Sequence, residues 1–386
     1  MILPEGIREG LCLICQNGKI QDIVPVDSYR RLSHDNILDA QGQYVSPGFI
    51  DIHVHGGGGH DFMDGTVEAY LGAAKAHAEH GTTSMVPTTL TCSDEELFRT
   101  FEVFRKAKEL NTEGAELLGI HLEGPYFSPD QAGAQDPEYL QKPSPESYCR
   151  IMDASDDIIR WSVAPELDGA LEMGLWLKQK GVLGSVGHSN AVYEDVEKAF
   201  EAGFTHITHL YSAMSSITRR NAYRYAGVVE AAYLIDDVTV EIIADGIHLP
   251  APLLKFVYKF KGPEKTALCT DAMRGAGMPD GEYMLGSLEK GQAVIVEDGV
   301  AKLPDRSAFA GSVATADRLV RTMMTLAEVS LEDAVMMMTS TPAGILGLDW
   351  FKGALKPGYD ADIVIFNDDI IISKTISHNH VIYSRD

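Results

Sequence analysis

The chain has 386 residues, and its 32 lysine and arginine residues against 56 aspartate and glutamate residues give a formal net charge of −24. A surface this acidic repels a phosphate backbone, which excludes a general nucleic-acid-binding role. The composition, 45% hydrophobic and 23% charged, is that of a globular protein, and the length suits a large α/β barrel with an additional small domain.

Neither secretion nor membrane insertion is indicated. The first 20 residues contain no charged segment followed by an apolar one, and no apolar run approaches about 18 residues. Cysteines are few, odd in number and scattered, which is typical of reduced thiols: Cys12, Cys15, Cys92, Cys149 and Cys269. We therefore expect a cytoplasmic protein with neither a membrane nor a nucleic acid as partner.

Short strands are predicted near both ends of the chain. At the N-terminal end they cover residues 10–15, 19–26 and 36–39, with the turn signal Asn17-Gly18 between the first two. At the C-terminal end they cover residues 362–366, 370–373 and 380–384. The two ends are therefore expected to share one small sheet.

The middle of the chain alternates short β-branched runs with helical stretches such as residues 66–80 and 191–202, a pattern typical of parallel βα units. Eight such units favour a closed (β/α)8 barrel, a TIM-like α/β fold. The predicted strands are residues 49–55, 82–89, 117–123, 159–165, 182–188, 205–209, 238–245 and 265–271.

Ionisable side chains fall at the ends of these strands, where barrel enzymes build their sites. They are His53, His55, Glu123, His188, His209, Asp245 and Asp271. His53 and His55 are two residues apart on a strand, so both can face the barrel axis and bind one ion. Imidazole and carboxylate groups suit zinc, iron or a similar divalent metal, and one carboxylate could bridge two ions.

A single histidine at a strand end is more often structural than a metal ligand, but the gathering of so many groups at one rim favours a metal site. Asp271 ends the last strand, where a catalytic base of the rim would sit. His206 lies three residues before His209 and is expected on the opposite face of its strand, with a structural role.

Several motifs in this order resemble the amidohydrolase superfamily and, within it, the N-acetylglucosamine-6-phosphate deacetylase family. They are Val-Ser-Pro-Gly-Phe-Ile-Asp-Ile-His-Val-His-Gly at residues 45–56, His-Leu-Glu-Gly-Pro at 121–125, Gly-His-Ser at 187–189, Thr-His-Leu-Tyr-Ser-Ala-Met at 208–214, Ala-Asp-Gly-Ile-His at 244–248 and Thr-Asp-Ala at 270–272. The ending at 353–362 resembles the superfamily's return into a small β-sandwich. The resemblance thus implies a barrel over 48–352 and a sandwich from 1–47 and 353–386.

The resemblance also implies one or two divalent metal ions, zinc or iron. Glu123, His188 and His209 match the ligands of the main ion. His53 and His55 match members with a second ion, in which Glu123 would be the bridge. Asp271 matches the catalytic carboxylate, which takes a proton from the attacking water and returns it to the leaving amine.

The resemblance implies a homodimer, in which an arginine reaches the site of the neighbouring subunit. The positions matching the family's substrate contacts are Ala134, Gln135, Ser212, Ala213, Arg220, His248, Phe309, Ala310 and Gly311. Three of them depart from the family pattern. Gln135 replaces a histidine and cannot carry a positive charge, Ser212 replaces an asparagine, and Arg220 lies in a longer segment where Arg224 is an alternative.

The expected function is therefore metal-dependent hydrolytic deacetylation of an N-acetyl amino sugar phosphate, with N-acetylglucosamine 6-phosphate giving glucosamine 6-phosphate and acetate. N-acetylgalactosamine 6-phosphate or another N-acyl compound is an alternative substrate. Another amidohydrolase reaction is less favoured, because Glu123 stands where cyclic-amide hydrolases would carry a carboxylated lysine. Gln135 also leaves open a non-catalytic sugar-binding barrel, but that protein would not need Asp271 and five ligand positions.

Overall fold

Eight parallel strands alternate with helices along the middle of the chain in the computed structural model, which describes residues 1–30 and 36–385. Each strand overlaps one predicted strand. Their bounds are β6 Phe49–Val54, β9 Thr82–Pro87, β11 Ile120–Glu123, β12 Ile158–Val163, β13 Leu183–Val186, β14 Phe204–Ile207, β17 Thr239–Ile242 and β18 Thr266–Leu268. β6 and β9 are buried along their whole length, as expected for parallel strands covered on both faces.

These strands follow one another around the barrel. β6 and β9 pair in a three-stranded sheet with β10 (Glu116–Leu117). A six-stranded sheet contains β11, β12, β13, β14, β17 and β18 in that order. Two parallel bridges join the sheets at both edges, between Thr88 and His121 and between Val54 and Ala272. The expected TIM-like barrel is therefore confirmed.

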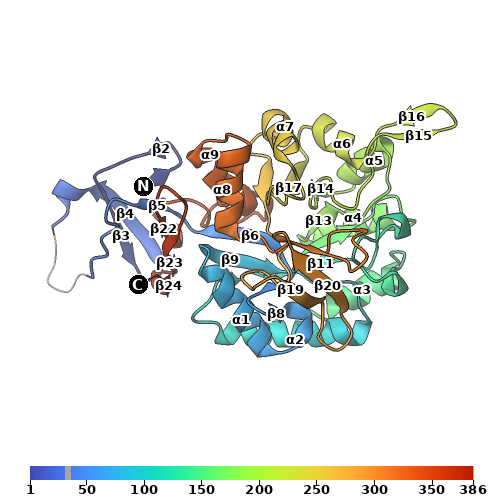
Figure 1. Ribbon diagram of the computed structural model, residues 1–386, viewed down its shortest axis with the longest axis horizontal. Helices are drawn as coiled ribbons and strands as arrows, with labels where there is room; N and C mark the ends of the chain where they lie inside the picture. The colour runs from blue at the N-terminus through green and yellow to red at the C-terminus, as the bar shows by residue number, and fades with distance from the viewer. Residues whose placement is uncertain (31–35, 386) are drawn as a thin grey trace.

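Helices surround the strands (Figure 1). They are α1 Val67–Ala78, α2 Asp94–Leu110, α3 Pro145–Asp153, α4 Ala170–Lys180, α5 Tyr193–Glu201, α6 Val228–Leu234, α7 Ala251–Lys261, α8 Ala316–Leu326, α9 Leu331–Met336 and α10 Ser340–Ile345. The helix predicted at residues 66–80 is α1. The Thr66 side chain accepts a hydrogen bond from the Ala69 amide at its start, and buried residues such as Tyr70 and Ala73 face the core. The helix predicted at residues 191–202 is α5.

The two ends of the chain lie side by side at one end of the molecule (Figure 1). An N-terminal hairpin of β3 (Leu11–Gln16) and β4 (Lys19–Pro25) lies near a four-stranded sheet in the order β24, β23, β22, β5. The bounds of that sheet's strands are β5 Tyr44–Pro47, β22 Ile363–Phe366, β23 Ile372–Ser377 and β24 His380–Ser384. Ile20 of the hairpin and Ile363 and Ile376 of the sheet belong to one buried cluster. The two ends of the chain therefore share a sheet, but through β5, which was not predicted as a strand. The predicted strands 10–15 and 19–26 instead form a two-stranded sheet of their own.

One predicted strand is wrong. Residues 36–39 form no strand, and the side chains of Ile37 and Leu38 are exposed. Because these apolar side chains are not buried against the neighbouring sheets, the hydrophobic driving force for a strand is missing at this segment.

Smaller antiparallel elements are inserted between the strands and helices of the barrel. A hairpin of β15 (Thr218–Arg220) and β16 (Tyr223–Tyr225) projects away from the body of the molecule (Figure 1). A three-stranded meander packs Leu285 and Val294 together with Met273, close to the end of the last barrel strand. Its strands are β19 Gly281–Leu285, β20 Gln292–Glu297 and β21 Val300–Lys302. Within residues 1–30 and 36–385, no helix is both long and apolar enough to cross a membrane.

A buried lysine ties the terminal sheets to the barrel. The Lys352 Nζ lies 2.7 Å from a carboxylate oxygen of Glu116 in β10. It also lies 3.0 Å from Asp360 and 2.7 Å from Asp362, which precede β22. Burial alone would lower the pKa of Lys352, but Asp362 and Glu116 raise it above its usual value, so the lysine stays charged.

Replacing Lys352 by methionine leaves these carboxylates buried without their cation. Loss of one partner of a buried ion pair costs about 3 kcal/mol, so we expect Lys352→Met to lower the free energy of unfolding by roughly that amount in a denaturant titration. Lys356→Met is the matched control, because Lys356 is exposed in the same segment. Equal stability of the two variants would contradict the role of Lys352.

Candidate metal centre

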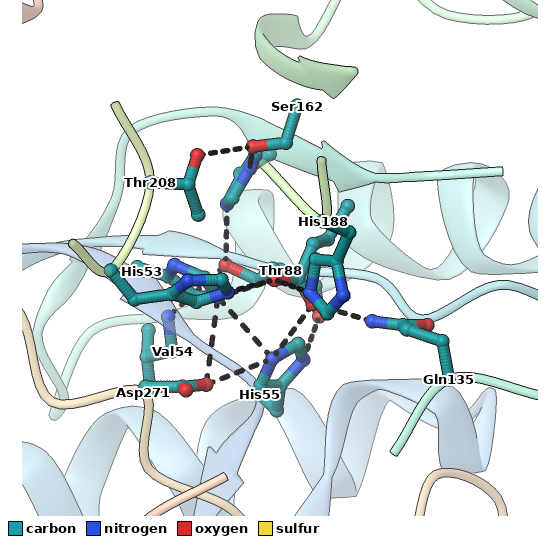
Figure 2. Close-up of polar contacts among 12 residues, drawn as sticks. His53, Val54, His55, Thr88, Gln135, Ser162, His188, Thr208 and Asp271 are labelled. Atoms are coloured by element: carbon teal, nitrogen blue, oxygen red, sulfur yellow. Dashed lines mark hydrogen bonds and ion pairs between the residues drawn. The ribbon is translucent and has the colours of Figure 1, made fainter. Parts of the chain in front are cut away.

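The candidate metal ligands meet at the C-terminal ends of the barrel strands (Figure 2). His53 lies in β6 and Glu123 ends β11. The rings of His53 and His55 point to the same place, with their Nε2 atoms 3.4 Å apart. This is the orientation expected from their spacing of two residues on a strand.

Glu123 lies at the middle of the group. Its Oε1 is 3.4 Å from His53 Nε2, 3.3 Å from His188 Nε2 and 3.1 Å from His209 Nε2. Its Oε2 is 3.4 Å from His55 Nε2. Two sets of possible ligands therefore share this carboxylate, one with His53 and His55 and one with His188 and His209.

Asp271 lies beside the first of these sets. Its Oδ1 is 3.1 Å from His55 Nε2 and 3.5 Å from His53 Nε2. Burial alone would raise the pKa of Asp271, but His53 and His55 lower it below its usual value. The carboxylate is therefore ionised at neutral pH and able to accept a proton.

The chemistry of the donor set fits a divalent cation. The Nε2 atoms of His53 and His55 face each other, and two imidazole nitrogens at this distance need a shared proton or cation between them. Burial alone would lower the pKa of His55, but Asp271 and Glu123 raise it well above its usual value. Burial alone would raise the pKa of Glu123, but His53, His188 and His209 hold it well below its usual value. Both shifts indicate that the centre favours positive charge, and its imidazole and carboxylate groups are suitable ligands for a divalent metal ion.

Three of the residues at the centre have a left-handed backbone conformation. The φ angles are 47° at His188, 27° at His209 and 48° at Asp271. Such conformations cost about 1 kcal/mol or more in residues other than glycine and cluster at functional sites. They also correct the predicted strands 182–188, 205–209 and 265–271, which end at Val186, Ile207 and Leu268.

The position of His206 corrects another prediction. Its Nε2 lies 3.4 Å from Glu241 Oε2, and the other oxygen of Glu241 contacts His53, so His206 faces the barrel interior. The alternation of faces along the strand does not continue to His209, because β14 ends at Ile207 and His209 is left-handed.

Gln135 contacts the metal-ligand candidate Glu123. Its Oε1 accepts hydrogen bonds from the Thr91 amide at 2.8 Å and from the Thr91 hydroxyl at 3.0 Å. This orients its Nε2 toward Glu123 Oε2, to which it donates at 2.7 Å (Figure 2). Gln135 also lines a cavity of about 290 Å³ together with Ala134 and Leu285.

Several other predicted substrate contacts lie around the same rim. Ser212 donates its amide hydrogen to the His209 carbonyl at 2.9 Å, and a Cβ added at Gly133 would lie 3.5 Å from the His188 ring and 3.7 Å from Ala213. A Cβ added at Gly311 would lie 3.0 Å from the Asp271 carbonyl oxygen. The neighbouring Ala310 is buried.

The predicted groups His248 and Asp245 form a pair of their own. His248 Nδ1 lies 2.8 Å from Asp245 Oδ2, and the His248 ring lies 4.5 Å from the ring of Phe309. Asp245 therefore belongs to the rim but contacts His248 and not the candidate metal ligands.

Arg220 is not brought to the centre of its own chain. It lies on the projecting hairpin of β15 and β16, exposed, with its guanidinium 5.3 Å from the ring of Tyr225. Arg224 lies on the other strand of the hairpin, opposite Arg219. Among the described residues, Arg220 therefore contacts its neighbour Tyr225 on the hairpin and not the candidate metal ligands.

Sequence reasoning missed Glu241 and Arg160, which form a buried ion pair beside His53. The available signal was a charged residue in the interior of each of two predicted strands, Arg160 in 159–165 and Glu241 in 238–245. Burying such a charge in a barrel strand is costly unless it is paired.

A parallel barrel with imidazole and carboxylate groups gathered at the strand ends defines this chain as a barrel protein with a candidate metal centre. Residues 44–382 match the model of the Amidohydrolase family, so the chain belongs to that family. The predicted family is therefore confirmed.

The chain is similar to deacetylases of two amino sugar phosphates. It is 35% identical to an N-acetylglucosamine-6-phosphate deacetylase of Lysinibacillus sphaericus, over 89% of this chain and 87% of that relative. It is 33% identical to an N-acetylgalactosamine-6-phosphate deacetylase of Escherichia coli O157:H7, over 97% of this chain and 95% of that relative. Among solved structures, an N-acetyl-D-glucosamine-6-phosphate deacetylase variant of Mycobacterium smegmatis in complex with N-acetyl-D-glucosamine-6-phosphate superimposes with a TM-score of 0.86. The two sequences are 31% identical, and the superposition covers 96% of this chain and 94% of the chain of that structure.

The raised pKa of His55 predicts that metal binding is linked to proton release. A metal binds neutral imidazole, so the ion must displace the proton that His55 holds in the metal-free protein. We expect the apparent affinity for zinc to rise between about pH 6 and about pH 8. Calorimetry in two buffers of different ionisation enthalpy measures the released protons, and an affinity independent of pH with no proton release would contradict this.

Proposed function

We propose that this chain is a metal-dependent deacetylase that hydrolyses N-acetylglucosamine 6-phosphate to glucosamine 6-phosphate and acetate. The observation that carries the proposal is the shared position of Glu123 between two pairs of imidazole groups, with the ionised Asp271 beside one pair. The deacetylase relatives and the substrate bound to the Mycobacterium smegmatis enzyme support the choice of substrate.

Glu123, His188 and His209 would hold the main ion, and His53, His55 and Glu123 a second one. A divalent ion bound there would activate both the amide carbonyl and a water molecule. We propose zinc or iron, because imidazole with carboxylate suits these metals.

Asp271 would move the proton. Its carboxylate accepts a proton as the water oxygen bonds to the acetyl carbon, and it delivers that proton to the sugar nitrogen as the C–N bond breaks. The products are acetate and the free amine. The left-handed backbone at Asp271 and the close approach of Gly311 to its carbonyl fix the position from which the carboxylate acts.

The sugar would lie on the rim between His248 and the segment that contains Ser212 and Ala213. Asp245 binds His248 Nδ1 and so leaves its Nε2 free for the substrate. We propose a homodimer in which Arg220 or Arg224 from the projecting hairpin of one subunit binds the phosphate at the centre of the other. A bidentate guanidinium contact suits a phosphate group.

N-acetylgalactosamine 6-phosphate is the second candidate substrate. The similarity to the Escherichia coli enzyme covers almost the whole chain, and the substitutions Gln135 and Ser212 fall among the positions expected to contact substrate. These two positions are the sequence features that favour a change in the sugar or acyl group.

The remaining proposals concern organisation and location. We propose that the terminal sheets form the expected β-sandwich from residues 1–47 and 353–386, with the barrel over 48–352. The buried cluster shared by Ile20 and Ile363 supports this arrangement. We also propose a cytoplasmic location, in keeping with the scattered cysteines, all of which are free thiols in the structure.

Acetate release from three sugars tests the proposed activity directly. Metal-loaded protein is expected to turn over N-acetylglucosamine 6-phosphate with a higher kcat/KM than unphosphorylated N-acetylglucosamine, because the phosphate adds a charged contact. The galactosamine 6-phosphate analogue separates the two candidate epimers. No acetate from any of the three would contradict the deacetylase and favour a sugar-binding barrel.

Asp271→Asn tests the proton-transfer role. The amide cannot accept the proton, so we expect kcat to fall by roughly 10²-fold or more, with metal content retained as measured by elemental analysis. Asp317→Asn is the control, since Asp317 is a largely buried carboxylate that contacts His80 outside the centre. Near-normal turnover by the Asp271 variant would refute the assignment of this base.

A further inference from the structure

A completely buried ion pair lies inside the barrel directly behind the metal centre. Arg160 of β12 and Glu241 of β17 have no exposed side-chain surface. Arg160 Nη1 donates to Glu241 Oε2 at 2.6 Å, and Nη2 donates to Oε1 at 2.8 Å. The pair is therefore bidentate, the geometry that holds a carboxylate most firmly.

The remaining donors of Arg160 are also satisfied. Nη1 donates to the Ile52 carbonyl at 2.9 Å, Nη2 to the Thr208 hydroxyl at 3.0 Å and Nε to the Ser185 hydroxyl at 3.2 Å. All five N–H groups of the guanidinium thus have acceptors, which come from four separate segments of the barrel. The guanidinium is fixed in place, and so is the carboxylate that it holds.

Glu241 contacts two metal-ligand candidates, one through its imidazole ring and one only through its backbone. Its Oε1 lies 2.7 Å from His53 Nδ1 and 3.3 Å from the backbone nitrogen of His209. Because the guanidinium of Arg160 donates to both of its oxygens, Glu241 is present as a carboxylate that only accepts hydrogen bonds. His53 Nδ1 must then carry the hydrogen, and its Nε2 is left to face Glu123 and His55.

His53 differs in this respect from the other three histidines. His188 Nδ1 contacts the Gln131 carbonyl at 2.8 Å, and His55 Nδ1 contacts the Thr88 carbonyl at 3.2 Å. His209 Nδ1 is buried with no partner among the described residues. Among these four histidines, only His53 has a carboxylate as the partner of its Nδ1. Such a partner makes an imidazole a more basic ligand and fixes the orientation of its ring.

We propose that Glu241, held by Arg160, is a positioning residue that fixes the tautomer and orientation of His53 and thereby determines how strongly the second metal ion is bound. The inference rests on the proposed two-ion centre and deepens it. A buried ion pair adds little to stability when compared with well-packed apolar residues, so its placement behind the imidazole ring of His53 points to that ligand. Glu241 contacts His209, a candidate ligand of the main ion, only at the backbone nitrogen, and it contacts no ring nitrogen of His188 or His209.

Metal counting on the purified holoenzyme tests the proposal without measuring activity. Wild-type protein and Glu241→Asp are loaded with zinc, dialysed against a graded series of chelator concentrations and analysed for bound metal. Asp keeps the charge that neutralises Arg160, but its carboxylate is one methylene short of His53. We expect one of the two ions to bind about 10- to 100-fold more weakly in the variant, with the other ion unchanged.

Two further variants separate positioning from stability. Glu241→Gln keeps the size of the side chain but removes its charge, and we expect the same selective weakening. His206→Gln is the matched control, because His206 contacts Glu241 through the other oxygen and does not touch His53. We expect this variant to bind both ions as the wild type does. Parallel weakening of both ions in all variants would show a merely structural role.

The outcomes are distinct. If the wild type binds two ions and a folded Glu241 variant binds both with unchanged affinity, the positioning role of Glu241 is overturned, but the two-ion centre is not. A wild type with a single ion would contradict the two-ion centre as well. If neither Glu241 variant folds, the nitrogen-15 shifts of His53 in the wild-type apoprotein decide: a protonated Nδ1 supports the proposal, and a protonated Nε2 overturns it.

Discussion

The candidate site depends on one buried carboxylate. Glu123 is surrounded by four imidazole groups, and its negative charge is stable inside the barrel only because positive charge is kept beside it. The same arrangement makes the centre suitable for a cation, since imidazole and carboxylate groups of separate strands already point at each other. Glu123 also accepts a hydrogen bond from Gln135, which fixes its second oxygen.

The barrel provides this arrangement at a cost in backbone energy. Parallel strands bring the ends of distant segments to one rim, but a strand alone would alternate its side chains between two faces. Left-handed residues at His188, His209 and Asp271 break that alternation and direct the side chains inward. Because such conformations are unfavourable, packing of the surrounding strands and helices must stabilise them.

The sequence predicts the parts of the site that depend on local spacing. His53 and His55 share a strand face because they are two residues apart, and Glu123 ends a short apolar run. It does not predict contacts set by the closure of the barrel, such as the pairing of Arg160 with Glu241, 81 residues apart. The predicted strand at residues 36–39 is wrong: the side chains of Ile37 and Leu38 stay exposed, so burial does not reinforce the local β-propensity.

Anomalous diffraction from crystals grown with zinc tests the central claim most directly. The account predicts two peaks that share Glu123, one beside His188 and His209 and one beside His53 and His55. The first peak alone would contradict the two-ion centre, and the absence of any peak at Glu123 in zinc-loaded crystals would contradict the metal centre as a whole.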